Sequence, residues 1–504
     1  MWPFSRKKKQ GSRIYKGALV GRTTADWIVM NTSADAEIRT SLPKLRDRSR
    51  QLVRDNDYVQ SAQRNVRTNV VGQGVGFQSQ VRMRRGKDSY GKGKLNKEMN
   101  DQIEGAWYRW QRKENCHTAG MLCFDDIERL VMDSNFESGE VLVRFVTQRM
   151  GSSKVPLALE IIESDMLDDG LNDIAANGNA IRMGVEVNSW GRPVAYWFHA
   201  RHPGDYPMVQ TNTADRARAR KRVPADEILH LFITKRPNQT RGVPWLHSTI
   251  LRLHHMGGYE EAEVIAARAT ACQMGFIQSP EGDAPGDMVE NGQRVTESEP
   301  GVWKYLAPGE TANMITPSRP GGQFDPFIRL MLRGVAAGVG GSYESISRDY
   351  SQSNYSSSRL ALIDDRELWK ILQGWLIKNF HQVVYERWMD LAVLSGELVI
   401  PDYETNRENY IYPRWMPRGW AWVDPAKEVA ASIAAVRAGF TTVSEVVAQA
   451  GGDYEELLVQ RQHELELAKE YGVVFDTDPA AVDGTGAAQA LAEAGKDPPP
   501  PPKK

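Results

Sequence analysis

A helical pattern of unusual length lies in the C-terminal half of the chain. Apolar residues recur at the three-to-four-residue spacing of one helix face, at Trp369, Leu372, Leu376, Phe380, Val383, Val384, Trp388 and Leu391. A helix from about Ser357 to Leu394 would be on the order of 60 Å long. That length exceeds an ordinary globular helix and suits a strut or a member of a helical bundle.

A polar segment directly precedes this pattern. Between Ser347 and Ser358 stand six serines, two tyrosines and an asparagine. Such a segment is open to three interpretations: a flexible linker, a serine-nucleophile loop, or a surface against which something slides. A serine nucleophile needs a base within hydrogen-bond reach and an oxyanion site. No histidine lies near in the sequence, and no Ser-Xaa-Xaa-Lys or Gly-Xaa-Ser-Xaa-Gly signature occurs there, so we read the chain as non-enzymatic.

Residues 40 to 240 have the pattern of an α+β domain. Helical spacing covers 42–71, 95–112 and 124–139, with Trp107 and Trp110 as an aromatic stripe. Strand patterns follow in "EVLVRFVTQRM", "LALEIIESDML" and "EILHLFITKR", and residues 178–201 predict one hairpin. "GQGVGF" follows a helix, so we interpret it as a helix end and turn rather than a phosphate loop.

A cluster of acidic residues offers a candidate metal site, at Glu163, Asp165, Asp168, Asp169 and Asp173. The spacing does not fit a calcium loop, because Gly170 is misplaced and no closing glutamate follows. We therefore expect a solvated turn, with metal binding as the alternative. Three cysteines at irregular spacing fit neither a disulfide framework nor a zinc site. No cofactor is expected.

The remaining segments are mostly helical. Pro244 to Met274 predicts a long helix, and its alanine-rich "EVIAARATACQMG" implies close packing against a neighbour. A lobe rich in Gly, Pro and Glu follows, and then a short helix in "FDPFIRLMLRGVAAGVGG". Capping residues predict three further helices between 424 and 472, one of them from the Thr442/Glu445 capping box. The Pro-rich end after 472 has a disordered composition.

The charge balance restricts the function classes. The 504 residues carry 63 basic and 64 acidic groups, a net charge of −1. A protein that binds nucleic acid tightly usually has an excess of basic residues, so any DNA contact should be loose or local.

The length of the chain predicts two to four domains. No run of eighteen apolar residues occurs, so no membrane contact is expected. The N-terminal "MWPFSRKKKQGSR" is basic and suits a solvated arm, with contact to a partner or nucleic acid as the alternative.

The order of these elements resembles a tailed-bacteriophage portal protein of the lambda-type family. Three segments carry the resemblance: "SRQLVRDNDYVQSAQRNVRTNVVGQGVGF", "RVPADEILHLFITKRPNQTRGVPWLHSTILRLHHMGGYEEAEVIAARATA" and "GGSYESISRDYSQSNYSSSRLALIDDRELW". The resemblance implies an α+β portal fold with a wing, a helical stem, an inserted clip lobe, a long kinked helix and a helical crown. It also implies a ring homo-oligomer, a dodecamer, at the capsid portal vertex of the virion, formed in the host cytoplasm.

The resemblance further implies domain boundaries and partners. The expected regions are an N-terminal arm (1–40), wing (41–243), stem helix (244–274), clip (275–323), second stem helix (324–338), tunnel loop (339–356), long helix with return to the wing (357–423), crown (424–472) and tail (473–504). The expected partners are double-stranded DNA, held transiently and without sequence specificity, the terminase large subunit, a head-tail connector protein, and the major capsid protein or scaffold. A nuclease or protease of the same assembly pathway is the alternative function, and an adaptor without a channel is a third.

The expected site residues fall into three groups. Those lining the DNA channel are Ser342, Tyr343, Ser347, Arg348, Ser351, Gln352, Ser353, Asn354 and Ser356. The hinge residues are Gly338, Gly340 and Gly341. The terminase-facing clip residues are Glu281, Asp283, Asp287, Glu290, Glu297 and Glu299. Short, polar, uncharged side chains suit a lining that must not hold DNA, and Arg348 and Arg359 are the exceptions. They could point at DNA or pair with Asp349 and Asp364 between subunits.

Overall fold

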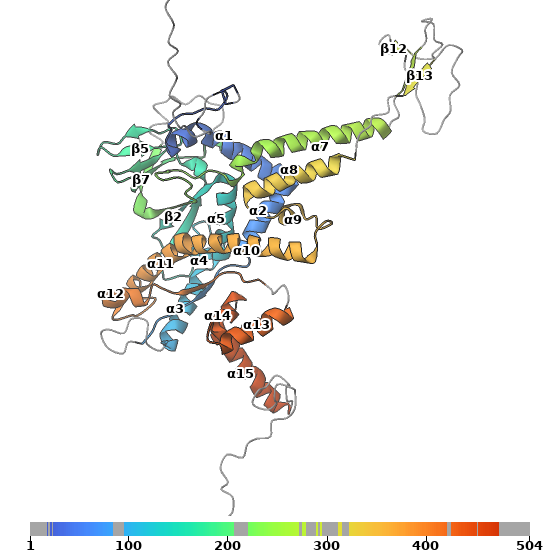
Figure 1. Ribbon diagram of the computed structural model, residues 1–504. Helices are drawn as coiled ribbons and strands as arrows, with labels where there is room; N and C mark the ends of the chain where they lie inside the picture. The colour runs from blue at the N-terminus through green and yellow to red at the C-terminus, as the bar shows by residue number, and fades with distance from the viewer. Residues whose placement is uncertain are drawn as a thin grey trace, which may run out of the picture.

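The computed structural model describes residues 18, 21–22, 24–83, 95–205, 220–271, 275–278, 289–290, 293–294, 311–314, 322–420, 425–450 and 452–472. The α-helices are α1 (Ala34–Asp55), α2 (Asp57–Val70), α3 (Lys97–Trp110), α4 (Lys113–Cys116), α5 (Phe124–Ser138), α7 (Ile250–Ala271), α8 (Phe324–Val339), α9 (Tyr343–Ser347), α10 (Tyr355–Leu376), α11 (Gln382–Leu394), α12 (Tyr403–Asn406), α13 (Pro425–Arg437), α14 (Val443–Gln449) and α15 (Tyr454–Glu470). Figure 1 shows α7 and α8 leaving the body on one side, and α13–α15 gathered at one end.

The strands form small antiparallel sheets. Their bounds are β1 (Gly76–Gln78), β2 (Glu140–Val146), β3 (Ala158–Ile162), β4 (Asp173–Ile174), β5 (Ala180–Arg182), β6 (Val185–Val187), β7 (Pro193–His199), β8 (Arg220–Pro224), β9 (Ile228–Phe232), β10 (Gly275–Gln278), β11 (Val289–Glu290), β12 (Gln293–Arg294), β13 (Thr311–Met314) and β14 (Arg414–Met416). The larger sheets have the orders β3-β2-β9 and β4-β5-β6-β7-β8. The predicted hairpin is present as β6 and β7, but β5 precedes it as a separate strand. Met183 and Gly184 both have positive φ and make the extra turn.

The first long helical pattern is divided in the structure. A single helix over 42–71 was predicted, but α1 starts earlier, at Ala34, and ends at Asp55. Asn56 takes an extended backbone conformation and its side chain accepts a hydrogen bond from the Val59 amide, which starts α2. Gly72 follows α2 with φ of 66°. The interpretation of the glycine stretch as a helix end and turn is therefore confirmed.

The main core joins the N-terminal half to segments almost 300 residues later. Trp107 and Trp110 of α3 are fully buried, and Trp107 packs against Tyr385 and Trp388 of α11 with ring centroids 5.5 and 5.0 Å apart. Each large side chain buried in this way contributes about 1.5–3 kcal/mol. The cluster fixes the end of the long helix against the α+β part of the chain.

The long helix predicted over 357–394 is confirmed, with a start two residues earlier. Asn354 and Ser357 form a capping box at the start of α10. Helical structure then continues through α10, a π-turn at Ile377–His381, and α11 to Leu394. The π-turn places the buried His381 with its Nε2 2.9 Å from Oε1 of the buried Glu128. A single extra residue in a helix is typical of such turns.

Helices α7 and α8 pack against each other and extend together from the body (Figure 1). Close packing against a neighbour was expected at the alanine-rich end of α7. Within this one chain Val264 and Ile265 there are 50% and 58% exposed, so that expectation stays a prediction. Glycines of α8 allow close contacts within the chain. A Cβ at Gly334 would overlap Arg252, and one at Gly338 would lie 2.3 Å from Thr249.

Candidate functional site

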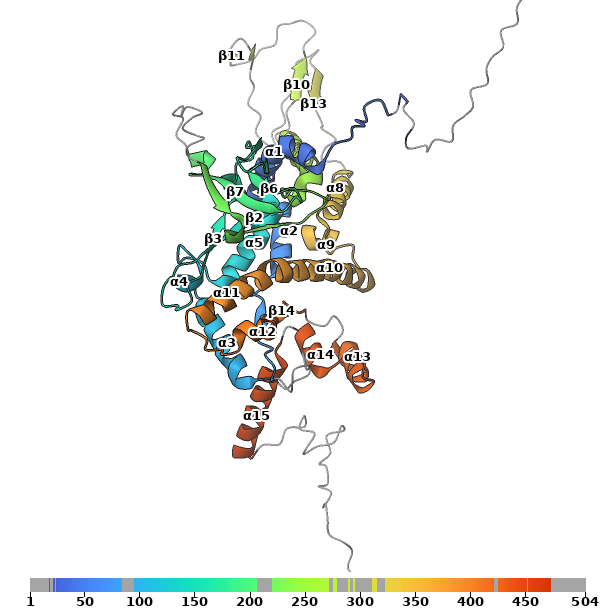
Figure 2. The same ribbon diagram turned by 90° about the vertical axis from the view of Figure 1, so that its left-hand side faces the viewer.

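The predicted tunnel loop is partly helical. After α8 the chain turns at Gly340, whose φ is 87°, and then forms the short helix α9. Ser342 caps this helix by accepting a hydrogen bond from the Ser345 amide. The expectation of a continuous polar loop from 339 to 356 is therefore wrong for its first half. Figure 2 shows α9 lying between α8 and α10.

Asp365 of the long helix holds the start of α9. Its carboxylate accepts hydrogen bonds from the Ser342 amide at 2.8 Å and from the Ser342 hydroxyl at 2.6 Å. Burial raises the pKa of Asp365, although the contacts with Ser342 oppose that rise. Ser347 donates its hydroxyl to the Tyr343 carbonyl, and Tyr343 donates its own to Asp349 at 2.9 Å. Three of the predicted lining residues thus hold the local fold together.

The three predicted hinge glycines have different roles. Gly340 has the left-handed conformation that ends α8, where a residue with a Cβ is disfavoured. Gly341 follows it without a positive φ. Gly338 lies inside α8, and its missing Cβ lets that helix approach Thr249. Gly338 is therefore a packing contact within a helix in this conformation, and its role as a hinge stays a prediction.

An exposed polar turn, residues 348–354, remains between α9 and α10. Its exposed predicted lining residues are Arg348, Ser351, Gln352 and Asn354, and Ser356 is exposed in the first turn of α10. Ser353 is half-buried and donates its hydroxyl to the Tyr350 carbonyl. Hydrogen bonds from Ser351 and Tyr343 lower the pKa of Asp349 to about 2.

The two arginines of this region differ in their surroundings. Arg348 has a positive φ of 59° and is exposed at the end of α9. Arg359 lies 3.8 Å from Glu428 of α13 rather than with Asp364. Within the chain Asp349 contacts Tyr343 and Arg329, and pairing of the two arginines with Asp349 and Asp364 between subunits stays a prediction.

The predicted clip residues fall largely beyond the described chain. Glu281, Asp283, Asp287, Glu297 and Glu299 lie outside the described residues. Glu290 is in β11, which pairs antiparallel with β12.

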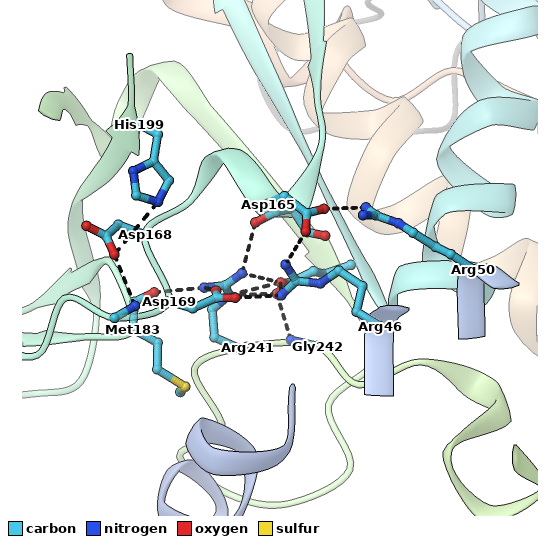
Figure 3. A network of polar contacts seen from close by, with 12 residues as sticks. Arg46, Arg50, Asp165, Asp168, Asp169, Met183, His199, Arg241 and Gly242 are labelled. Carbon is cyan, nitrogen blue, oxygen red and sulfur yellow. Dashed lines mark hydrogen bonds and ion pairs between the residues drawn. The ribbon is translucent and has the colours of Figure 1, made fainter. Parts of the chain in front are cut away.

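The acidic cluster is not the solvated turn that was expected. Asp165 accepts a hydrogen bond from Arg46 at 3.0 Å and also contacts Arg50. Asp169 contacts Arg46 and Arg241. Figure 3 shows these arginines converging on the two carboxylates. The turn is therefore an anchor for α1 and for the segment before α7.

A fully buried ion pair lies at the centre of this network. Arg241 and Glu140 are both 0% exposed in their side chains, and the Arg241 guanidinium contacts the Glu140 carboxylate. Burial alone would raise the pKa of Glu140, but Arg241 and His230 leave it lowered. The Gly242 amide also donates to Glu140, at 2.8 Å. Because each charged group has several hydrogen-bond partners, these contacts offset the cost of removing the two charges from water.

The other acidic residues of the cluster do not form a convincing metal site. Glu163, Asp165 and His202 bring possible ligand atoms within 4.8 Å of one another. Two guanidinium groups already contact the Asp165 carboxylate. Asp168 is buried, and its Oδ2 lies 2.6 Å from Nε of Arg220. This arrangement fits structural ion pairing.

Sequence reasoning missed Arg46, Glu140 and Arg241. A charged residue opening the mostly apolar "EVLVRFV" strand was the one available signal for Glu140. Its partners stand far away in the sequence, so no local pattern indicated them.

None of the helices in the described part of the chain combines the length and apolar character needed to cross a bilayer.

Comparison with known proteins gives a consistent result. The family model described as phage portal protein, lambda family, matches residues 20–373. The probable portal protein of Halomonas phage phiHAP-1 is 32% identical over 481 residues, covering 93% of this chain and 89% of that protein. Portal protein B of Escherichia phage lambda is 21% identical and covers 95% of this chain and 93% of its own length. A solved chain from the neck of a native GTA particle, computed with C12 symmetry, is 15% identical, with a TM-score of 0.43 over 80% of this chain and 93% of that chain. On the extent of the family match and of the phiHAP-1 relationship, this chain belongs to the lambda family of phage portal proteins.

Proposed function

We propose that copies of this chain close into a ring at the portal vertex of a phage capsid, through which DNA is packaged and later ejected. The observation that carries this proposal is a set of large apolar side chains left exposed along α7, α8 and α10. They are Leu251, Val264, Ile265, Leu330, Leu360, Ile363 and Ile371, between 43% and 70% exposed. Exposed apolar surface of this extent marks interaction sites, and head-to-tail contacts between copies close into rings.

The charge distribution supports a channel that does not retain DNA. A ring multiplies each channel-facing side chain by its copy number, and a basic wall would bind phosphates at many points. The exposed turn between α9 and α10, together with the first two residues of α10, carries serine, glutamine and asparagine side chains with Arg348 as its basic exception within 348–356. We assign this turn, rather than the whole of 339–356, to the channel.

The family relationship supports the finer assignments within this proposal. The ring has twelve copies, with a wing at 41–243 and 357–423, stem helices at 244–274 and 324–338, a clip at 275–323 and a crown at 424–472. The terminase large subunit docks first on the clip and the head-tail connector later, while the capsid protein or scaffold meets the outer ring. The role is non-enzymatic, and the ring assembles in the host cytoplasm before it becomes part of the virion.

Negative-stain microscopy of the purified full chain tests the ring. We expect particles with a central hole and rotational symmetry. Incubating the same preparation with duplex DNA and magnesium should leave the DNA intact, because the role is non-enzymatic. Monomers that cut DNA under these conditions would refute the portal assignment.

Deletion of residues 280–320 tests the clip assignment. We expect the shortened chain to form rings, because the core and the exposed faces of α7, α8 and α10 lie outside the deleted segment. Binding of the terminase large subunit to these rings, measured by co-sedimentation, should fall below detection. Deletion of the tail 473–504 is the matched control and should leave terminase binding unchanged. Normal terminase binding by the 280–320 deletion would contradict the assignment.

A further inference from the structure

Four consecutive large apolar residues precede α1 and are exposed. Trp27, Ile28, Val29 and Met30 are 72%, 79%, 87% and 73% exposed. Figure 2 shows the dark blue segment before α1 running away from the body of the chain. A contiguous apolar run of this kind marks an interaction site. We refer to Trp27–Met30 as the apolar arm.

The chain holds the base of the apolar arm in place. Arg236 donates a hydrogen bond to the Thr32 carbonyl at 3.0 Å and forms an ion pair with Glu37 at 2.9 Å. Ser33 caps α1 by accepting from the Ala36 amide. The free part of the arm therefore begins just before Thr32, and it starts in a defined position.

A groove of about 890 Å³ lies between the C-terminal half of α1 and the N-terminal half of α7. Leu52, Ile250, Leu251 and Leu253 supply its apolar surface. Leu251 is 63% exposed, although it is a large apolar side chain. The other residues that line the groove are Arg48, Gln51, Asp55, Asn56, His254, His255, Gly257, Gly258 and Glu261. We call this feature the α1/α7 groove.

Two adjacent glycines in the middle of α7 line this groove. Glycine is unfavourable inside a helix compared with alanine. A Cβ added at Gly257 or Gly258 would meet nothing within 4 Å. In contrast, a Cβ at Gly334 of α8 would overlap the guanidinium end of Arg252 within the chain. The pair at 257–258 therefore serves no close contact within the described chain and leaves bare backbone that another chain can approach.

The backbone of the same chain's apolar arm is too short to reach the Leu52 end of this groove. From Ala34, α1 extends about 21 Å to Arg48 and about 27 Å to Leu52 at the rise of an α-helix. From Ala34 back to Trp27, even a fully extended chain spans at most about 25 Å. The arm of a second copy has no such restriction. In a ring, each chain has an identical neighbour at high effective concentration.

The charges near the groove also suit this occupant. Asp55 and Glu261 line it together with one arginine, Arg48, so carboxylates outnumber guanidinium groups in the lining. The sequence preceding the arm is basic, with Arg6, Lys7, Lys8, Lys9, Arg13 and Lys16. Opposite charges on the two segments favour their association and fix its direction.

We propose that the apolar arm of one subunit binds in the α1/α7 groove of the adjacent subunit and links the ring head to tail. This inference rests on the ring proposed above. Trp27 is the main anchor, since a tryptophan that becomes buried at an interface contributes strongly to binding.

Disulfide crosslinking tests this contact directly. We would introduce Val29→Cys with Leu251→Cys in a chain whose Cys123 and Cys272 are serine, and oxidise the assembled rings. Denaturing electrophoresis should show a ladder of covalent oligomers. Val29→Cys with Leu330→Cys is the matched control, since Leu330 is similarly exposed at 65% but lies on α8, and it should give no ladder. Val29→Cys with Ser41→Cys reports the arm folding back on its own α1, and a monomeric crosslink there in place of the ladder would overturn the proposal.

Filling the groove provides an independent test. Gly257→Met with Gly258→Met places side chains in open space within a helix, so the melting temperature of the dissociated subunit should stay the same or rise. The concentration at which rings dissociate should increase about tenfold or more, because the arm loses its site. Rings that resist dilution as well as the wild type would contradict arm docking. If rings form without the ladder, only the arm contact fails; if the wild type forms no rings, the proposed function fails as well.

Discussion

Arg241→Met is expected to lower the free energy of unfolding of the subunit by about 3–5 kcal/mol, because it leaves the Glu140 carboxylate buried without its main partner. Both side chains are fully buried. Arg241 also donates to the Met183 and Ser164 carbonyls at 2.8 and 3.2 Å. One substitution therefore removes several contacts between β2, the acidic turn and the segment before α7. Urea denaturation followed by tryptophan fluorescence measures the loss.

The pH dependence of this variant gives a second measurement. In the wild type, Arg241 helps to keep the pKa of Glu140 lowered, so the pair stabilises the fold at neutral pH. In the variant, burial acts on Glu140 with less opposition and favours its protonated form. The stability deficit should be largest near pH 7 and shrink as the pH falls toward 4.5. Glu140→Gln added to Arg241→Met should recover part of the loss at pH 7.

Arg54→Met is the matched control for Arg241→Met. Arg54 pairs with Asp55 but its side chain is 75% exposed, and exposed pairs contribute little. We expect no measurable change in the urea midpoint. Equal midpoints for the Arg241 and Arg54 variants would show that the buried network does not stabilise the subunit.

Lysines at Ser351, Gln352 and Ser356 are expected to reduce genome packaging by about tenfold or more while rings still form. All three positions are exposed, and without the Ser351 hydroxyl Asp349 still accepts hydrogen bonds from the Ser351 amide and the Tyr343 hydroxyl, so the substitutions should leave the fold intact. We leave Ser353 unchanged because its hydroxyl bonds the Tyr350 carbonyl. Three added cations in each copy of a ring would bind phosphates at many points and hold the DNA.

Two measurements check the lysine variant. Nuclease-protected DNA per particle, after complementation of a portal-deficient phage, reports packaging. DNA binding by purified rings at several salt concentrations reports the new phosphate contacts, and each contact should steepen the logarithmic salt slope by about 0.9. Glutamine at Ser351 and Ser356 is the uncharged control and should package normally. Unchanged packaging together with an unchanged salt slope would place the 348–356 turn away from DNA.

Elements defined by neighbouring residues were predictable from the sequence. Apolar spacing predicted the helix that ends at Leu394, and the Thr442/Glu445 capping box that starts α14 is present as expected. The periodicity and the capping groups lie within a few residues of each other, so the chain carries both locally. The early start of α1 and the break at Asn56 were missed, because the helical spacing continues across that residue.

The candidate site was only partly predictable. A serine-rich composition indicated a polar surface, and its exposed half, Ser351 to Ser356, agrees with that. It did not show that Ser342 is bonded to Asp365, 23 positions later. The same composition therefore contains residues that form a surface and residues that hold α9 in place.

The acidic turn shows most clearly what could not be predicted from the sequence. Its spacing excluded a calcium loop, and that reasoning used only local positions. Whether the carboxylates face water or arginine depended on Arg46, 119 residues from Asp165, and on Arg241, 101 residues from Glu140. Helix and strand patterns come from neighbours along the chain, so the sequence alone indicated most of the elements and the resemblance to the family. Burial and ion pairing come from segments that meet only after folding, and the tertiary structure alone decided which charged and polar side chains are anchors and which are surface.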